Sequence, residues 1–264
     1  AFGQISEKDI LQHPIEWYPA NGIDLRLGAA VGEFTATPGA VGKETFDALI
    51  VATGAGPILP DYVRLAPGAI LPLWNQGDAI RIREKARAGA PLVILGGGII
   101  GIETALRAAD AGMKVTLIEK MERLMPGYFG PGGSAVLAAV LERKGIRVLV
   151  SRSVSTVRNE GAALDLDGGE SLEPTLAIVS IGARRDPALA ARAGLQTGLG
   201  IVVDAAQRTS AERVFACGDI AQIGDCPSRC SVPEALAQGK VAGHNACGAP
   251  PFLTHEPKTA ALSF

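Results

Sequence analysis

Hydrophobic and polar positions along the chain follow two alternating patterns, which predict buried strands and amphipathic helices in turn. Leu92–Leu95 is a continuous apolar run of the kind buried in a parallel sheet. Apolar positions at helical spacing follow over residues 99–111, and Lys114–Glu119 then resumes a strand. These segments form one strand–helix–strand unit of the expected size.

The same patterns continue on both sides of this unit. Ile23–Leu27 alternates apolar and polar residues, as a half-buried strand does, and residues 6–11 predict a helical start. Short strands are expected over 154–172, with a hairpin turn at Asp167–Gly169. This alternation predicts an α/β fold with a mainly parallel sheet. Further strands are predicted at 46–52, 145–150, 176–181 and 201–204, and further helices at 78–88, 134–144 and 232–247.

Composition limits the class of protein. The chain has 264 residues, of which 47% are hydrophobic, so it can bury a core and form two domains or lobes. Its formal net charge of -2 and pI near 6.0 give no reason to expect nucleic acid or an acidic membrane as a partner. No apolar run reaches the roughly 18 residues of a spanning helix, and no signal peptide opens the sequence. We therefore expect a cytoplasmic protein.

Cysteine and histidine usage predicts no metal site. The four cysteines are too few and too irregularly spaced for a disulfide scaffold, and the three histidines do not cluster around them. Ordinary thiols are the favoured interpretation, ahead of a metal or redox role. The first residue is Ala1, so we expect a processed product or a fragment. The cysteines are Cys217, Cys226, Cys230 and Cys247.

A glycine-rich turn follows the buried strand and opens the helix. The run Gly96-Gly97-Gly98-Ile99-Ile100-Gly101 fits the pattern G-x-G-x-x-G in the context that makes it informative. Gly96 permits a sharp turn, Gly98 lets the backbone approach a pyrophosphate, and Gly101 lets the helix lie close to the strand. The amino end of the helix then offers N–H groups to the phosphates. The pattern predicts a dinucleotide site, against the alternative of a glycine turn that binds nothing.

Two carboxylates near this turn are candidate ligand contacts. Glu119 closes the second strand, where it accepts hydrogen bonds from the adenosine ribose and repels a 2′-phosphate, so NADH is favoured over NADPH. Glu103 is our candidate for positioning the nicotinamide, although a carboxylate favoured by the helix dipole explains it equally well. Ile99 and Ile100 are candidates for part of a nicotinamide platform, but an apolar helix face in the core is the favoured interpretation.

At this point the sequence resembles a known family. Leu95–Glu103 looks like the NAD domain of the two-dinucleotide flavoprotein reductases, the pyridine nucleotide-disulfide oxidoreductase superfamily, as do Val51–Gly54 and Ala216–Asp219. Within it, the chain is most similar to rubredoxin and ferredoxin reductases and to the flavoprotein part of nitrite reductase. That finer match is carried by Glu16–Tyr18, Asn21–Ile23 and Arg123–Pro126.

The resemblance implies a Rossmann-like three-layer NAD domain inserted into a discontinuous FAD-type domain. Residues 1–77 and 200–264 would be the two FAD-type pieces, and residues 78–199 the NAD domain. It implies FAD contacts at Gly218 and Asp219, whose carboxylate would accept a ribityl hydroxyl. The remaining candidate cofactor residues are Thr53 and Gly54, which imply a crossover next to the flavin, and Gly182.

Taken in isolation, Gly218 and Asp219 would be a plain turn that caps the next helix. Relative to the family pattern, we expect the chain to lack the amino-terminal FAD fingerprint and the carboxyl-terminal interface domain. Cys217 stands where a small alanine is usual, and Ser180–Gly182 replaces the more common Ala-Thr-Gly. A redox cysteine of disulfide-reductase relatives would lie outside this sequence.

These features predict an FAD-linked NADH-dependent oxidoreductase. It would pass a hydride from NADH to FAD and electrons onward to an acceptor protein or redox centre. The resemblance also leaves a homodimer open. One alternative is a fragment or redox-sensing module that binds NADH without flavin turnover. Another is a Rossmann dehydrogenase without flavin, which would need a His, Lys or Tyr dyad that is not evident in the sequence.

Overall fold

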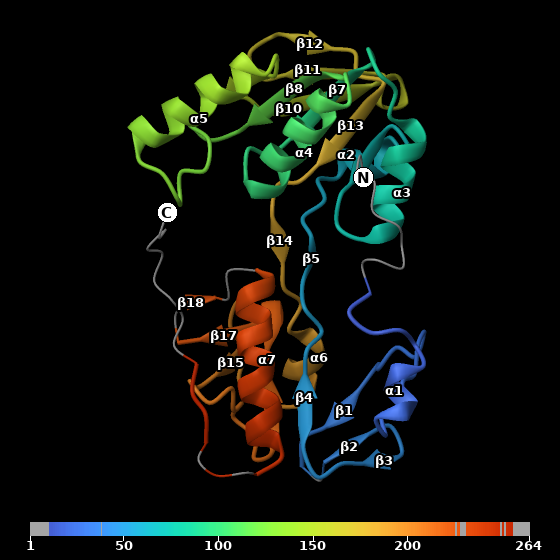
Figure 1. Cartoon of the computed structure of the whole chain (residues 1–264), viewed down its shortest axis with the longest axis vertical. Helices are drawn as coiled ribbons and strands as arrows, with labels where there is room; N and C mark the ends of the chain where they lie inside the picture. Colours follow the sequence, from blue (N-terminus) through green and yellow to red (C-terminus); the bar gives the residue numbers. More distant parts are fainter. Residues whose placement is uncertain are drawn as a thin grey trace. The chain divides into compact units, whose positions relative to one another are not determined.

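The computed structural model describes residues 11–37, 39–224, 226–227, 231–248, 250 and 252–255. The chain divides into two compact units. Among the described residues, unit 1 comprises residues 57–182, and unit 2 comprises those before residue 57 and after residue 182. Within the described residues, the chain therefore crosses between the units at Gly56–Pro57 and at Gly182–Ala183 (Figure 1).

Unit 1 is built on a five-stranded sheet in the order β6-β13-β7-β8-β9, in which every pair of neighbours is parallel. A separate antiparallel sheet contains β10, β11 and β12. The elements of unit 1 are α2 (Tyr62–Leu65), β6 (Ile70–Pro72), α3 (Gln76–Lys85), β7 (Pro91–Leu95), α4 (Ile99–Asp110), β8 (Lys114–Glu119), α5 (Pro131–Arg143), β9 (Arg147–Val150), β10 (Val154–Arg158), the short helix η2 (Asn159–Gly161), β11 (Ala163–Leu166), β12 (Ser171–Leu172) and β13 (Leu176–Val179).

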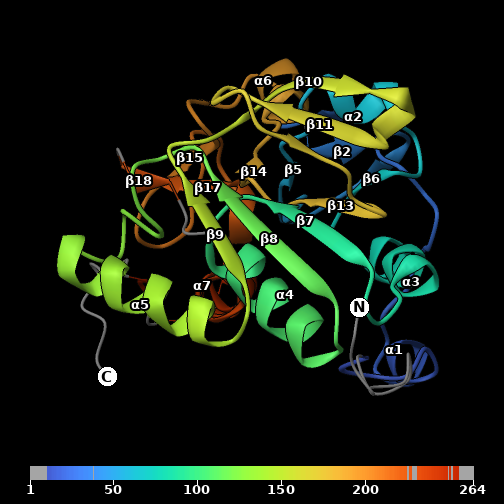
Figure 2. The same ribbon diagram turned by 90° about the horizontal axis from the view of Figure 1, so that it is seen from above.

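The parallel sheet is the middle of three layers, because successive side chains of β7 enter different cores. Leu92 and Ile94 join the cluster that includes residues of α3, α4 and α5. Val93 and Leu95 join the opposite cluster, which includes Leu164 of β11. Figure 2 shows α4 and α5 on one face of the sheet and β10 and β11 on the other. A strand covered on both faces must be apolar throughout, which explains the unbroken run in the sequence.

Unit 2 contains small sheets and one long helix. Strands β4 and β16 pair in parallel, β15 pairs with β17 and β17 with β18, and β1, β2 and β3 form an antiparallel sheet. Phe215 and Cys217 contribute to a core with Ala242 of α7, whereas Val214 and Ala216 belong to another cluster. The elements of unit 2 are α1 (Trp17–Ala20), β1 (Phe34–Thr35), β2 (Ala40–Val41), β3 (Glu44–Thr45), β4 (Leu49–Val51), α6 (Ala188–Arg192), β15 (Ile201–Val203), β16 (Val214–Ala216), the short helix η3 (Gly218–Ile220), β17 (Ala221–Ile223), β18 (Cys226–Pro227) and α7 (Val232–Ala246); β5 (Gly56–Pro57) and β14 (Ala183–Arg184) pair where the chain passes between the units.

The predicted α/β fold with a parallel sheet is confirmed. The two compact units divide at residues 56/57 and 182/183. β6 pairs with β13 of the parallel sheet, and Ala190 and Leu195 enter the core of unit 2. The domain boundaries expected at 77/78 and 199/200 stay predictions.

The strand predicted at Ile23–Leu27 is wrong. These residues form no strand, and the side chains of Ile23, Leu25 and Leu27 are exposed. Alternation alone does not make a strand without a partner and a core to bury one face. Of the helix expected at 6–11, all but Leu11, which is not helical, lies outside the described residues.

Candidate functional site

The turn from β7 into α4 requires glycine at two positions for different steric reasons. Gly96 has φ +111°, and a Cβ atom there would collide with the backbone carbonyl of Ser180, which follows β13. A Cβ atom at Gly101 would collide with the carbonyl oxygen of Gly96. The first turn of α4 therefore lies directly against the end of β7, as predicted.

Gly98 has a different environment. It is the N-cap of α4 with extended backbone (φ -84°, ψ -175°), and no atom lies within 4 Å of the place where a Cβ would stand. No side chain caps the helix at this position. The first N–H groups of a helix have no partner within the helix, and such an amino end is suited to binding an anion.

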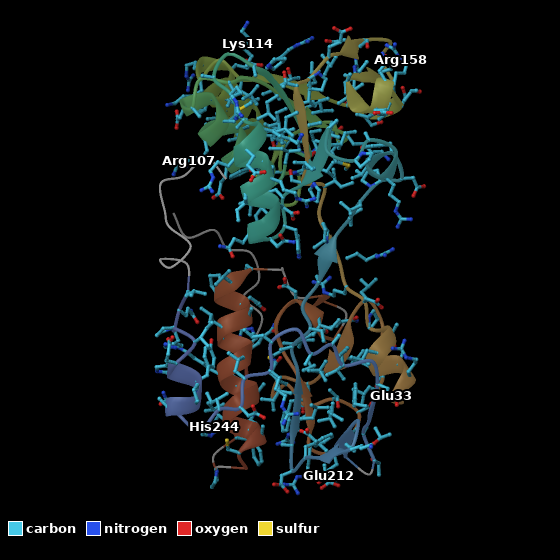
Figure 3. All side chains as sticks on the ribbon, turned by 90° about the vertical axis from the view of Figure 1, so that its right-hand side faces the viewer. Glu33, Arg107, Lys114, Arg158, Glu212 and His244 are labelled. Carbon is cyan, nitrogen blue, oxygen red and sulfur yellow. The ribbon has the colours of Figure 1, made fainter. Side chains whose placement is uncertain are left out.

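Glu119 is held in place by backbone N–H groups from two sides. Its Oε2 accepts a hydrogen bond of 2.7 Å from the N–H of Gly97, and its Oε1 accepts one of 2.7 Å from the N–H of Met121. The side chain is half-buried at the carboxyl end of β8. Figure 3 labels Lys114 at the opposite, amino end of this strand. Each carboxylate oxygen keeps further lone pairs, so Glu119 is an oriented acceptor beside the glycine turn.

The structure brings Gly182 to the same edge of the sheet. β13 lies next to β7 in register, and the N–H of Ser180 donates to the carbonyl of Leu95 at 2.8 Å. Gly182, two residues on, has φ +115° and is exposed. Ile181 before it is 40% exposed.

The opening of α4 carries the other candidates of unit 1. Ile99 and Ile100 are 46% and 45% exposed, and Glu103, one turn further on, is also exposed. The expectation that the two isoleucines belong to the core is therefore wrong. Their exposure leaves an apolar surface at the open end of the turn, with one carboxylate in the next helical turn.

Unit 2 brings together a second set of predicted residues. β4 and β16 are parallel neighbours, so the segments that follow them lie at the same edge. The N–H of Cys217 donates to the carbonyl of Val51 at 3.1 Å, which places Thr53–Gly54 and Gly218–Asp219 after paired strand ends. Thr53 is exposed, and both Gly54 (φ +69°) and Gly218 (φ +74°) have left-handed backbone.

Asp219 lies in a partly desolvated position. Burial raises the pKa of its carboxyl group, and the positive charge of Arg185 opposes part of that shift. The guanidinium Nε of Arg185 also donates to the backbone carbonyl of Asp219. Asp219 thus presents a half-buried carboxyl group just after the paired ends of β4 and β16.

Sequence reasoning missed the residues that support these turns. Ser180 supplies the carbonyl that confines Gly96, and Arg185 contacts Asp219. Gln238 accepts a hydrogen bond from the N–H of Gly218 at 2.7 Å across 20 residues of sequence. Glu234 and Gln238 have the i, i+4 spacing of neighbours on one helix face. That spacing does not show that Gln238 accepts a hydrogen bond from Gly218.

The comparison with known proteins identifies the family. The family model for pyridine nucleotide-disulphide oxidoreductases matches residues 6–242. This chain belongs to that family.

Two curated relatives are similar over nearly the whole chain. A rubredoxin-NAD(+) reductase of Pseudomonas putida is 28% identical over 93% of this chain and 67% of the relative. The ferredoxin–NAD(+) reductase component of a 3-phenylpropionate/cinnamic acid dioxygenase from Photorhabdus laumondii is 30% identical over 94% of this chain and 68% of the relative.

Among solved structures, the covalent putidaredoxin reductase–putidaredoxin complex is similar with a TM-score of 0.87 and 27% identity. The match covers 95% of this chain and 64% of the other. The chain therefore spans about two thirds of the length of these relatives. In the part of the chain that the structure describes, no helix combines the length and the apolar character needed to cross a bilayer.

Proposed function

We propose that this chain carries the nucleotide-binding machinery of an NADH-dependent flavoprotein oxidoreductase. The observation that carries the proposal is the glycine turn: Gly96 and Gly101 have no room for a side chain, whereas Gly98 faces open space. A turn compressed on the protein side and open on the other fits a pyrophosphate against the amino end of α4. Membership of the family and the names of the relatives agree with this proposal.

In unit 1, the proposed ligand is NADH. Gly97 and Gly98 would line the pyrophosphate, and Glu119 would accept hydrogen bonds from the ribose hydroxyls. The N–H groups of Gly97 and Met121 hold the Glu119 carboxylate in one orientation, which favours two hydroxyls over a 2′-phosphate. Glu103 is proposed to position the nicotinamide, with Gly182 close by at the end of β13.

In unit 2, the residues present fit part of a flavin site. Thr53 and Gly54 would pass close to the flavin, Gly218 would let the backbone approach, and the Asp219 carboxylate would accept a ribityl hydroxyl. The half-buried Asp219 carboxyl group follows the paired ends of β4 and β16, which agrees with a contact to a polar ligand. The assignment of unit 1 to NADH and of unit 2 to FAD is part of the proposal.

When bound, the two cofactors supply the redox chemistry, in which a hydride passes from nicotinamide to flavin and electrons then leave to an acceptor. The residues of this chain bind, orient and keep out water, and they need no acid–base dyad. The relatives are reductases of rubredoxin and of a ferredoxin, so the proposed acceptor is a small electron-transfer protein. A homodimer and a cytoplasmic location stay predictions.

The NADH site is tested by Glu119→Ala, with Glu122→Ala as the matched control. Glu122 is an exposed carboxylate three residues further on. The loss of hydrogen bonds to a charged acceptor should weaken NADH by about 10- to 100-fold. NADPH should lose less, because a repulsive charge disappears as well. Equal losses for NADH and NADPH, measured by fluorescence titration, would contradict the ribose role.

The flavin half has a separate test. The chain is incubated with FAD, free FAD is removed by gel filtration, and the visible spectrum is recorded before and after anaerobic addition of NADH. We expect retained flavin absorbance that NADH bleaches faster than NADPH does. A colourless chain that still binds NADH would overturn the oxidoreductase proposal and favour a nucleotide-binding module.

A further inference from the structure

The buried side chain of Gln238 links helix α7 to the turn at Gly218. Gln238 is 1% exposed, and its Oε1 accepts a hydrogen bond of 2.7 Å from the backbone N–H of Gly218. Gly218 follows β16 and opens the short helix η3, which contains Asp219. A buried side-chain amide needs hydrogen-bond partners, because burying it without them costs free energy.

Only one orientation of the Gln238 amide satisfies both of its neighbours. Its Nε2 donates to Oε1 of Glu234 at 3.2 Å, one turn earlier in α7. A carboxylate only accepts and a backbone N–H only donates, so the NH₂ group must face Glu234 and the oxygen must face Gly218. The orientation of the Gln238 amide is therefore fixed by its two partners, Gly218 and Glu234.

Glu234 is itself fixed from outside the helix. Nε2 of His255 lies 3.1 Å from Oε1 of Glu234, and both side chains are only 12% exposed. The backbone N–H of His255 donates to the carbonyl of Ala205 at 2.7 Å. The chain of contacts from Gly218 to His255 thus ends on the backbone of another segment of unit 2.

The carboxyl-terminal segment that carries His255 is tied to α7 as well. The buried side chain of Asn245 accepts from the N–H of Leu253 at 2.9 Å and donates to the carbonyl of Ala206 at 2.9 Å. Asn245 and Glu234 lie near opposite ends of α7. Leu253 is therefore bound near one end of α7 and His255 near the other, and this stretch of chain supports the Glu234 carboxylate.

The turn at Gly218 needs such a support. Its backbone is left-handed (φ +74°), a conformation that glycine reaches without strain but to which it is not confined. The packing of α7 leaves the glycine free of close contact, since a Cβ atom there would meet only the Cβ of Ala235 at 3.7 Å. The hydrogen bond to Gln238 is thus one of the restraints on where Asp219 begins, beside the hydrogen bond from the Arg185 guanidinium to the Asp219 carbonyl.

We propose that Gln238 is a positioning residue, which holds the Gly218–Asp219 turn in the conformation that receives the flavin, with Glu234 and His255 setting its amide. The inference rests on the proposed function for the identity of the ligand. The contacts that carry it are those of the chain itself, so the positioning role can be tested with and without flavin.

The first test compares Gln238→Leu with Gln222→Leu. Gln222 is the matched control: it is also buried in unit 2, and its amide makes two hydrogen bonds, with Gly200 and Gly224, away from the turn. In the 264-residue chain, Gln238→Leu should weaken FAD binding by about 10- to 100-fold, whereas Gln222→Leu changes it little. NADH affinity should stay unchanged in both. Equal weakening of FAD by both variants would overturn the proposal.

Gln238→Glu supplies a readout that lost stability alone would not move. The new carboxyl group keeps an acceptor for Gly218 but faces the Glu234 carboxylate, with His255 and Asp219 as the other titratable neighbours. When two carboxyl groups lie side by side, the pKa of one of them is raised. The protonated group donates a hydrogen bond to its neighbour, whereas two ionised groups repel each other. FAD affinity of this variant should fall more steeply between about pH 5 and pH 8 than that of the unsubstituted chain. Parallel pH profiles would overturn the positioning role.

Exchange of the Gly218 amide proton separates this inference from the proposed function. Measured by NMR without cofactor, exchange should accelerate in Gln238→Leu and remain slow in Gln222→Leu. Unchanged exchange in both would overturn the positioning role whatever the ligand is. If the unsubstituted chain binds no FAD, the proposed function and the flavin assignment fail together, while the exchange comparison still decides whether Gln238 positions the turn.

Discussion

Three glycines of the α4 turn look alike in sequence but act through different physical constraints. Gly96 is needed for a left-handed backbone pressed against Ser180, and Gly101 is needed because the helix touches the strand. Gly98 has ordinary extended backbone and open space around it. The protein itself does not require glycine at this third position, which agrees with the proposed close approach of a pyrophosphate there.

This difference gives a prediction at the level of single residues. Gly98→Ala should leave the thermal midpoint nearly unchanged and weaken NADH by at least about 10-fold, because its Cβ occupies the pyrophosphate space. Gly101→Ala should lower the midpoint, because its Cβ collides with the carbonyl of Gly96. Thermal unfolding and NADH titration of both variants check this. A stable Gly98→Ala chain with unchanged NADH affinity would place the nucleotide elsewhere.

At the level of elements, the hairpin of β10 and β11 carries the clearest electrostatic pair. Nε of Arg158 lies 2.6 Å from Oδ2 of Asp165, and Arg158 projects from the surface of unit 1 (Figure 3). The hydrogen bond from Arg158, followed by that from Ser171, lowers the pKa of Asp165 from 3.8 to about 2. The pair lies in solvent, so its contribution to stability is small.

The sign of the pH effect follows from that lowered pKa. A carboxyl group with a depressed folded-state pKa contributes stability above its unfolded value, and the contribution is lost as pH falls through the folded value. The window is therefore about pH 4 down to pH 2. In Arg158→Met, the Asp165 pKa should return most of the way to its ordinary value, as followed by NMR titration of the carboxyl carbon.

Arg147→Met is the control for this titration. Arg147 forms a comparable surface pair with Glu170, at 2.5 Å, and does not contact Asp165. The Asp165 pKa should be the same in that variant as in the unsubstituted chain. A shift of equal size in both variants would show that general surface charge, not the Arg158 hydrogen bond, sets the value.

At the level of the whole molecule, the two units each carry one set of candidate ligand contacts. The Gly96–Gly101 turn and Glu119 belong to unit 1, whereas Thr53–Gly54 and Gly218–Asp219 belong to unit 2. A ligand stabilises the part of the structure that binds it, by about 2.7 kcal/mol at a concentration 100 times its dissociation constant. The two ligands should therefore leave different footprints on the chain.

Hydrogen–deuterium exchange measures these footprints. NADH should slow exchange at the amides of residues 97–101 and at Met121, and FAD should slow it at residues 217–219. The small sheet of β1–β3 in unit 2 serves as an internal control that NADH leaves unchanged. Slowed exchange at β1–β3 equal to that at residues 97–101 would contradict the assignment of NADH to unit 1.

The strand–helix–strand unit around the glycine turn could be predicted from the sequence, because it depends on residues that are close together in the chain. The apolar run of β7, the spacing of α4 and the end of β8 at Glu119 all follow from periodicity and burial, and the structure reproduces them. The exposure of Ile99 and Ile100 was not readable, because a helical apolar position shows which face it occupies and not what covers that face.

Contacts between distant segments were decided only by the tertiary structure. β13 enters the sheet between β6 and β7, and the compact units divide at residues 56/57 and 182/183. Gln238 supports Gly218 from a helix 20 residues further on. A sequence pattern records whether a residue is buried, but the partner of a buried polar group depends on which elements meet. The glycine turn and its carboxylate therefore follow from the local residue pattern, whereas the partners that hold each turn in place follow from the packing of distant elements.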